Sequence, residues 1–304
     1  MFNKNKKLIV ILGPTASGKT KLAVKLAKEF KGEIVSADSR QIYCGLDIGT
    51  AKPTKKQQVA VKHYLIDIKK LNQLYSTGQY KKEAIKIINK IIKNNKIPFL
   101  VGGTGLYIKA IVDNLEIPTV KPDWKLRDEL ELKIKKQGLK ALYDQLIKID
   151  PEAAYIIDSN NPRRIIRALE IALKTKKPFS QQRKKGELLF NILEIGLNPI
   201  KNKLRKEIEK RTDKMVKIGL VKEVKDLIKI YDKNLPCFDA IGYQEIIDYL
   251  EEKTSLKEAV SKIKKNTWHY SKRQMTWFKK DKKIHWIKNQ KEAERLVKKF
   301  LKNR

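Results

Sequence analysis

Short apolar runs alternate with stretches of helical periodicity in the first third of the chain. Residues 8–12, 33–37, 63–67 and 97–101 are mainly apolar, and residues 81–93 carry apolar side chains at helical spacing. A continuous apolar run is typical of a buried strand, and an apolar stripe is typical of a helix that covers a sheet. Strands that alternate with helices predict an α/β fold, with a parallel sheet covered by helices on both faces.

The hydrophobic pattern changes after residue 117. Pro118 and Pro122 interrupt the chain, and residues 124–172 are then helical in pattern and highly charged. Residues 191–197 return to strand character, and the chain from residue 201 onward is helical and basic. The pattern predicts a first part of a core, a helical insertion domain and a completion of the core with a basic helical end: residues 1–117, 118–190 and 191–304.

A glycine-rich turn lies between the first predicted strand and the helix after it. Its residues match G-x-x-x-x-G-K-[ST]: Gly13, Pro14, Thr15, Ala16, Ser17, Gly18, Lys19 and Thr20. The glycines let successive backbone N–H groups surround an oxyanion, and the helix N-terminus favours negative charge. Lys19 adds a charge for an outer phosphate, and Thr20 offers a hydroxyl to Mg²⁺. The turn predicts a P-loop NTPase-like core that binds a phosphate or diphosphate, without specifying which.

Two more loops follow predicted strands and should meet the P-loop, because sites in parallel sheets lie beyond the carboxyl ends of the strands. One comprises Asp38, Ser39, Arg40 and Gln41, and the other contains Thr104 after two glycines. Asp38 is a candidate to hold Mg²⁺ through water or to act as a general base, although a cap for the next turn is an alternative. Thr104 is a candidate anion ligand or a helix cap.

The overall composition favours a polyanionic partner. The formal net charge is +35, but only 11 of the 69 basic residues are arginine, so a chain-wide lysine bias is an alternative explanation. No apolar run approaches the length of a membrane span, and the apolar stretch behind the basic residues 1–7 is too short for a signal peptide. Cys44 and Cys237 lack metal or redox spacing. We expect a cytoplasmic protein with reduced thiols and no membrane partner.

Arginine is informative in a lysine-rich chain, because its fork binds phosphates in a bidentate manner. The densest cluster comprises Arg163, Arg164 and Arg167, where Asn161 and Pro162 are suited to a helix start. The cluster fits a phosphate backbone, with salt bridges to residues such as Glu170 as the alternative.

Three other segments are candidates for ligand contact. Arg211 could clamp a leaving diphosphate, with an ordinary surface role as the alternative. Residues 239–244 place a glycine between bulky neighbours, which suggests a close backbone approach. Residues 268–280 interleave aromatic and basic side chains, a pattern suited either to unpaired bases or to a helix that packs its aromatics into the core.

Together these segments resemble the tRNA dimethylallyltransferase family. The matching segments occur in the family's order: Gly13–Thr20, Asp38–Gln41 with Asp47–Pro53, Gly102–Tyr107, Asn161–Glu170, Ile241–Tyr243 and Lys272–Trp277. The resemblance covers about residues 8–286. It implies transfer of a dimethylallyl group from dimethylallyl diphosphate to N6 of adenine 37, beside the anticodon, in tRNAs that read codons starting with U. It also implies Mg²⁺ as cofactor and a P-loop that holds diphosphate instead of ATP.

The resemblance also implies roles for individual residues. Asp38 would take the N6 proton, and Thr104 and Arg211 would contact the diphosphate. Contacts with the tRNA anticodon stem-loop would come from Asp38, Ser39, Arg40, Gln41, Thr104, Arg127, Arg163, Arg164, Ile165, Ile166, Arg167, Asp239, Ala240, Ile241, Gly242, Tyr243 and Gln244. We expect the enzyme to act as a monomer.

Three other functions use a similar loop. A small-molecule kinase would bind ATP there, a related prenyltransferase would modify free adenine nucleotides, and a nucleotide-dependent RNA-binding protein would transfer nothing. No arginine-rich lid is evident, and the insertion and the aromatic–basic segment favour a polynucleotide acceptor.

Overall fold

A computed structural model describes residues 6–118, 120–182 and 184–302 of the chain. The chain forms two compact units, one of Met1–Val112 with Leu188–Arg304 and one of Asp113–Glu187. The second unit is therefore inserted in sequence between the fourth and fifth strands, and its limits lie a few residues before those of the predicted segment 118–190. In the described ranges no helix is both long enough and apolar enough to cross a bilayer.

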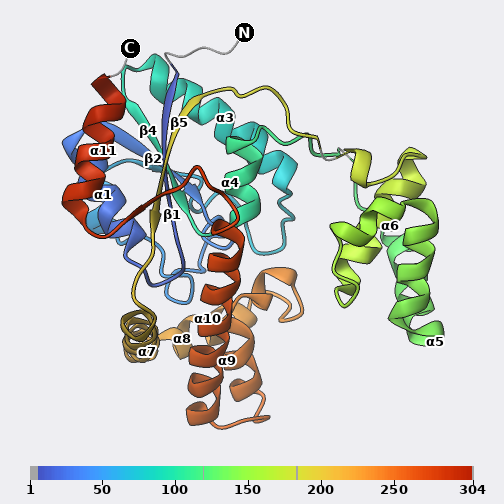
Figure 1. The fold of residues 1–304 in the computed structure, drawn as a ribbon. Helices are drawn as coiled ribbons and strands as arrows, with labels where there is room; N and C mark the ends of the chain where they lie inside the picture. Colours follow the sequence, from blue (N-terminus) through green and yellow to red (C-terminus); the bar gives the residue numbers. More distant parts are fainter. Residues whose placement is uncertain (1–5, 119, 183, 303–304) are drawn as a thin grey trace. The chain divides into compact units, whose positions relative to one another are not determined.

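The first unit is built on one sheet whose six strands all run parallel in the order β3-β2-β4-β1-β5-β6. The strands are β1 (Lys7–Leu12), β2 (Gly32–Ala37), β3 (His63–Tyr64), β4 (Ile97–Gly102), β5 (Asn191–Leu197) and β6 (His285–Ile287). The central strands are apolar on both sides because helices bury both faces of the sheet (Figure 1). The predicted α/β class with its parallel sheet is confirmed.

Two strands differ from the sequence prediction. The third was expected over residues 63–67, but pairing stops after Tyr64, because Leu65 and Asp67 adopt positive φ angles of 59° and 55°. The sixth strand was missed, since only three residues pair with β5 at the edge of the sheet. A segment this short has too few residues for an alternating pattern to be visible.

Helices α1 (Lys19–Glu29) and α11 (Gln290–Lys302) cover one face of the sheet, and α3 (Thr77–Lys93) and α4 (Gly105–Val112) cover the other (Figure 1). The predicted helix 81–93 is confirmed and begins a turn earlier, because Ser76 and Gln79 form a capping box. A short helix, α2 (Lys55–Ala60), lies between β2 and β3 in the sequence.

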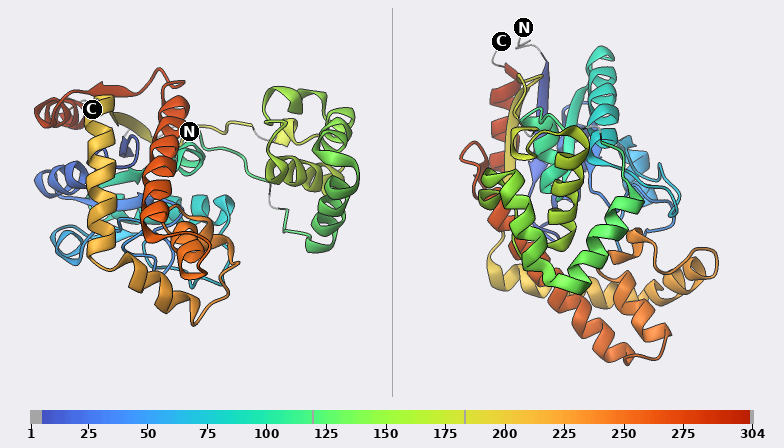
Figure 2. Two further views of the ribbon diagram at one scale, coloured as in Figure 1. Left: turned by 90° about the horizontal axis from the view of Figure 1, so that it is seen from below. Right: turned by 90° about the vertical axis from the view of Figure 1, so that its right-hand side faces the viewer.

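A helical layer extends the first unit beyond the carboxyl ends of the strands. It contains α7 (Lys201–Lys217), α8 (Leu220–Ile228), the 3-10 turn η3 (Pro236–Asp239), α9 (Tyr243–Leu250) and α10 (Leu256–Phe278). Helix α10 packs against α7, α9 and α4. The left view of Figure 2 shows this layer from below. Its end reaches the sheet core through buried Phe278, so the layer is joined to the strand ends.

The second unit is a small helical domain with its own core. Its elements are α5 (Trp124–Ile149), η1 (Pro151–Tyr155), α6 (Pro162–Thr175) and η2 (Ser180–Gln182). Gly138, with φ 81° and ψ 161°, interrupts α5, so the helix folds back on itself in two segments. Asn161 caps α6 by accepting a hydrogen bond from the Arg164 amide, as Asn161-Pro162 predicts.

Candidate active site

The P-loop connects β1 to α1 through backbone conformations that favour glycine. Gly13 has φ 148°, and a Cβ there would lie 2.8 Å from the carbonyl oxygen of Leu197. Gly18 has φ 87° and precedes the first residue of α1, so the helix N-terminus opens directly onto the loop. The sequence places an anion-binding turn here, and the structure forms it at the carboxyl end of a central strand.

The P-loop lines a cavity of about 760 Å³, and every residue that lines it belongs to the first unit. Lining residues come from five places: the P-loop and α1, the strand ends with Asp38 and Gly103, the segment 47–58, α7 with Arg211, and α10 with Gln274. Three groups that the sequence predicted separately, the P-loop, Asp38 and Arg211, thus meet in one cavity. The sequence predicted that Asp38 would meet the P-loop, because both follow strands of a parallel sheet. Arg211 comes from a distant helix, and the hydrophobic pattern gave no signal of its place in the cavity.

Two half-buried cations are oriented around the P-loop. Lys19 Nζ donates to the Pro14 carbonyl oxygen at 2.7 Å, and Arg211 Nη2 donates to Thr15 Oγ1 at 2.8 Å. Burial lowers the pKa of Lys19 to about 7; Asp38 opposes this shift and Arg211 adds to it. Burial also lowers the pKa of Arg211 to about 10. An anion between the two cations would offset this desolvation.

Two polar atoms beside the cations are buried without a partner within the described ranges. They are Ser17 Oγ in the P-loop and Nε of Arg211. Buried donors are costly to leave unpaired, so they usually mark a place where a ligand or water binds. A diphosphate oxygen is a suitable acceptor for both.

Asp38 stands at the end of β2, where its loop folds back on its side chain. Asp38 Oδ1 accepts from the backbone N–H groups of Arg40 at 2.9 Å and Gln41 at 3.4 Å. Asp38 Oδ1 thus caps the turn, while the residue also lines the cavity, where the second carboxylate oxygen can contact a ligand.

Thr104 joins the Asp38 loop to the loop after β4. Thr104 Oγ1 accepts from the Ser39 amide at 3.1 Å and lies 3.4 Å from Ser39 Oγ. The two strand ends approach closely, because a Cβ on Gly102 would lie 2.1 Å from the Ala37 carbonyl oxygen. The Thr104 hydroxyl is thereby fixed between the two loops.

Arg40 and Gln41 hold neighbouring loops in place. Arg40 Nη1 donates to the Pro236 carbonyl oxygen at 2.8 Å, which attaches η3 to the Asp38 loop. Gln41 is buried, and its Nε2 donates to the Thr50 carbonyl oxygen at 3.2 Å. Their predicted contacts with tRNA stay predictions, and in this structure both side chains position the cavity wall.

The segment 239–244 mixes exposed and buried residues. Asp239 and Gln244 are exposed, whereas Ala240, Gly242 and Tyr243 are buried. A tRNA contact by these three would have to use the backbone, and Ile241 is half-buried.

Glu223 is a positioning residue that the sequence did not reveal. Its Oε1 accepts from the Tyr243 hydroxyl at 2.7 Å, and its Oε2 accepts from the Ile48 amide at 2.8 Å. A Cβ on Gly49 would lie 2.4 Å from the Tyr243 ring. Glu223 and Tyr243 therefore fix the segment that forms one wall of the cavity. A lone glutamate on a charged helix carries no sequence signal for this role.

The arginines of the second unit differ in how far they are exposed. Arg127 Nε donates to Glu170 Oε1 at 2.9 Å, and Arg167 also pairs with this buried carboxylate. Burial would raise the pKa of Glu170, but hydrogen bonds from both arginines and from the Asp123 amide hold it below its usual value. Arg163 and Arg164 are exposed.

The buried neighbours of these arginines form the core of the second unit. Ile165 and Ile166 are 0% and 6% exposed, so their side chains pack inside the domain. Because Arg127 and Arg167 both pair with Glu170, the salt-bridge alternative describes these two arginines in this structure. The tRNA contacts of the cluster stay predictions.

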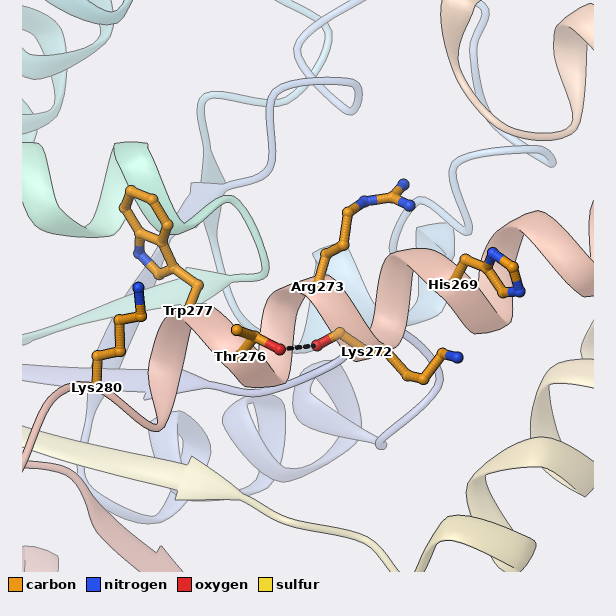
Figure 3. Close-up of a pocket in the computed structure, with 6 residues that line it drawn as sticks. All are labelled: His269, Lys272, Arg273, Thr276, Trp277 and Lys280. Carbon is orange, nitrogen blue, oxygen red and sulfur yellow. Dashed lines mark hydrogen bonds between the residues drawn. The ribbon is translucent and has the colours of Figure 1, made fainter. Parts of the chain in front are cut away.

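A basic groove of about 480 Å³ runs along α10 (Figure 3). It is lined by His269, Lys272, Arg273, Thr276, Trp277 and Lys280. Thr276 Oγ1 donates to the Lys272 carbonyl oxygen at 3.1 Å, and Lys109 from α4 lies 5.6 Å from the centre of the Trp277 ring. Phe278 packs in the core, as the core-packing interpretation expects, while the charged residues face solvent. A contact of this helix with unpaired bases stays a prediction.

The residues present fit a magnesium ion bound together with a diphosphate. No cluster of three or more histidine, cysteine or acidic residues suited to a metal occurs within residues 6–118, 120–182 and 184–302. Mg²⁺ commonly uses one or two protein oxygens, several waters and substrate phosphates, so such a cluster is not required. Thr20 and Asp38 line the same cavity and provide suitable oxygens.

The parallel sheet, the P-loop and the half-buried cations define a P-loop α/β protein with a site for a phosphorylated or diphosphorylated ligand. Residues 41–281 match the IPP transferase family. The chain is 45% identical over 273 residues to the tRNA dimethylallyltransferase of Acetivibrio thermocellus, covering 88% of this chain and 87% of the relative. It is 43% identical over 276 residues to that of Halalkalibacterium halodurans, covering 89% and 87%.

Solved structures agree with these relatives. The full-length tRNA isopentenylpyrophosphate transferase of Bacillus halodurans matches with a TM-score of 0.73 and 39% identity, covering 97% of each chain. A eukaryotic dimethylallyltransferase acting on tRNA matches with a TM-score of 0.82 and 27% identity, covering 99% of this chain and 80% of the other. The chain belongs to the tRNA dimethylallyltransferase family, and it is an enzyme of the prenyltransferase class.

Proposed function

We propose that the enzyme transfers a dimethylallyl group from dimethylallyl diphosphate to N6 of adenine 37 in tRNAs that read codons starting with U. The observation that carries this proposal is the meeting of Lys19, Arg211 and Asp38 at one cavity. Two half-buried cations suit the diphosphate leaving group, and one carboxylate suits the amine nucleophile.

The reaction is an in-line displacement. The N6 nitrogen forms a bond to the allylic carbon while the carbon–oxygen bond breaks, and the diphosphate leaves with the electron pair. Lys19, Arg211 and the P-loop amides stabilise the charge that grows on the leaving oxygen. Asp38 accepts the proton that N6 loses, and Thr104 helps to hold the diphosphate.

A bound Mg²⁺ would supply further positive charge to the diphosphate, with the Thr20 hydroxyl as its protein ligand, which leaves the Asp38 carboxylate available as the base. This assignment uses residues that line the cavity, together with the usual reliance of Mg²⁺ on substrate phosphates.

The acceptor is the anticodon stem-loop, whose adenine must be unstacked to reach the cavity. The exposed arginines of α6 and the basic groove on α10 provide suitable sequence-independent contacts with phosphates. We propose that the enzyme acts as a monomer in the cytoplasm, where this substrate is found.

A transfer assay tests the proposal. Labelled dimethylallyl diphosphate and Mg²⁺ are supplied with tRNA whose anticodon is followed by adenines, with AMP, or without acceptor. We expect label in the tRNA alone. Label in AMP would instead assign the enzyme to nucleotide prenylation, and ATP consumption without label transfer would indicate a kinase.

Asp38→Asn tests the assignment of the base. We expect kcat to fall by about 10²- to 10⁴-fold, because this is the usual contribution of a positioned general base. Dissociation constants for tRNA should stay close to those of the wild type. Turnover near the wild-type value with intact tRNA binding would remove Asp38 from this role.

A further inference from the structure

Gln274 connects two loops of the cavity to α10. Its Oε1 accepts from the Thr15 amide at 2.8 Å, and its Nε2 donates to the Gly103 carbonyl oxygen at 2.9 Å. The residue is only 6% exposed. Because water is largely excluded, loss of the side-chain amide would leave both backbone groups without an easy replacement partner.

The fit between Gln274 and Gly103 is close. A Cβ on Gly103 would lie 2.3 Å from Gln274 Nε2, whereas the other nearest atoms, Cδ of Gln274 and the Gly13 carbonyl oxygen, would lie at 3.5 and 3.7 Å. The absence of a side chain at residue 103 therefore allows the amide to reach the carbonyl. A methyl group there would displace the Gln274 amide and little else.

The contact continues from Gln274 to a cation of the site. The Thr15 amide donates a hydrogen bond to Gln274 Oε1, and the Thr15 hydroxyl accepts one from Arg211 Nη2 at 2.8 Å. Gln274 thus holds the residue that orients Arg211. The hydrogen bond also directs the Thr15 N–H toward α10, so this amide is already used in the absence of an anion.

The other face of α10 carries the basic groove. Arg273 and Thr276 line this groove, and the exposed Arg273 side chain extends away from the helix (Figure 3). Neighbouring residues on a helix point about 100° apart, so one turn can face the P-loop through Gln274 and solvent through Arg273. A small movement of α10 would therefore shift the groove residue Arg273 and the P-loop contact of Gln274 at the same time.

We propose that Gln274 is a positioning residue that couples RNA bound along the α10 groove to the P-loop and Arg211. The proposal rests on the proposed function for the identity of the groove's ligand, an RNA phosphate backbone. RNA that holds α10 in place would hold Gln274, Thr15 and Arg211 in the arrangement that binds diphosphate. By linkage, diphosphate would increase RNA affinity by the same factor.

Binding of inorganic pyrophosphate, measured by calorimetry with and without an anticodon stem-loop RNA, tests this coupling. In the wild type we expect RNA to tighten pyrophosphate binding by about fivefold or more, as is typical of coupled sites. Gln274→Met keeps the side-chain length but loses both hydrogen bonds. The ratio of pyrophosphate affinities with and without RNA should then fall toward one. An unchanged ratio in Gln274→Met, or no coupling in the wild type, would overturn the proposal.

A matched control is Gln290→Met at the start of α11, where the Gln290 amide pairs with Glu294 instead of the P-loop. It should leave the ratio at the wild-type value. Pyrophosphate binding needs no transfer, so an enzyme that modified no tRNA could still show the coupling. Failure of the proposed function and failure of this inference are therefore distinguishable.

A second pair of variants removes the dependence on Gln274→Met folding well. Gly103→Ala should weaken pyrophosphate binding in the wild type, because its methyl group displaces the Gln274 amide. In a Gln274→Ala background the methyl group has room, and the same substitution should have a much smaller effect on pyrophosphate affinity. Equal effects in both backgrounds would show that Gln274 does not mediate them, and melting temperatures identify any loss of fold.

Discussion

The P-loop cavity and the exposed arginines of α6 use the same residue type in opposite ways. Arg211 is held by Thr15 inside a cavity, and burial lowers its pKa. Arg163 and Arg164 are exposed at the first turn of a helix whose buried face packs in the core of the second unit. One arrangement is prepared for a single small anion, and the other suits a long polyanion.

This difference indicates how much each arginine should matter. A half-buried cation acts at lower effective dielectric and is already oriented, so it stabilises a developing charge strongly. An exposed cation is screened by salt and contributes one of many similar contacts. Large catalytic effects are therefore expected at the cavity and small, salt-dependent effects at the exposed arginines.

Arg211→Met should produce the largest effect of this comparison. Removal of one oriented donor from a developing oxyanion typically lowers kcat by about 10²- to 10³-fold. Steady-state kinetics with saturating tRNA measures this loss. Arg205→Met is the control, because Arg205 is exposed on the same helix and pairs with Glu209. Equal losses in both variants would contradict the distinction.

Glu170→Gln should destabilise the second unit while leaving diphosphate binding intact. Loss of charge-assisted hydrogen bonds to a buried group typically costs about 1–3 kcal/mol, and Arg127 and Arg167 stay partly solvated once the carboxylate charge is gone. Hydrogen exchange of α5 and α6 measures the effect. Asp144→Asn removes an exposed pair with Lys140 and should change protection little. Unchanged exchange in Glu170→Gln would show that Arg127 and Arg167 are not held by this carboxylate.

The pH dependence of pyrophosphate binding should reveal the half-buried lysine. The pKa of Lys19 in the free enzyme is lowered to about 7, and a bound anion favours the charged form. Below pH 7 the lysine is already charged, so it adds no pH dependence. Above pH 7 binding takes up a proton, and affinity should fall by up to about tenfold per pH unit.

Comparison with Lys19→Arg isolates this effect, because the ligand's own titration is common to both proteins and arginine stays charged. The difference between the two affinity profiles should therefore appear above pH 7. Parallel profiles would contradict the assignment of the proton to Lys19.

Arg164→Ala should produce the smallest effect. Loss of one exposed phosphate contact should weaken binding of the stem-loop RNA several-fold and reduce the salt slope by about one. Pyrophosphate affinity should not change. Arg295→Ala on α11 is the control for removal of an exposed arginine. Identical salt slopes in wild type and Arg164→Ala would exclude a phosphate contact there.

Local sequence patterns predicted most of the sheet and the P-loop. The runs at β1, β2, β4 and β5 are clear because both faces of these strands are buried. The P-loop is clear because its geometry depends on one short stretch of chain, with positive φ angles at Gly13, Ala16 and Gly18. The edge strand β6 and the early end of β3 could not be predicted, since each depends on a few residues and their neighbours.

The sequence by itself determined which chemical groups the enzyme has: a phosphate-binding turn, a carboxylate at a strand end and arginines in a lysine-rich chain. The meeting of the P-loop with the Asp38 loop follows from a parallel sheet, but only the tertiary structure decided which residues of distant helices join them. Gln274 and Thr15 are 259 residues apart, yet they share a hydrogen bond, and Arg127 meets Glu170 from another helix. Such contacts depend on how elements distant in sequence pack together and on which side chains become buried. A local sequence pattern contains neither kind of information.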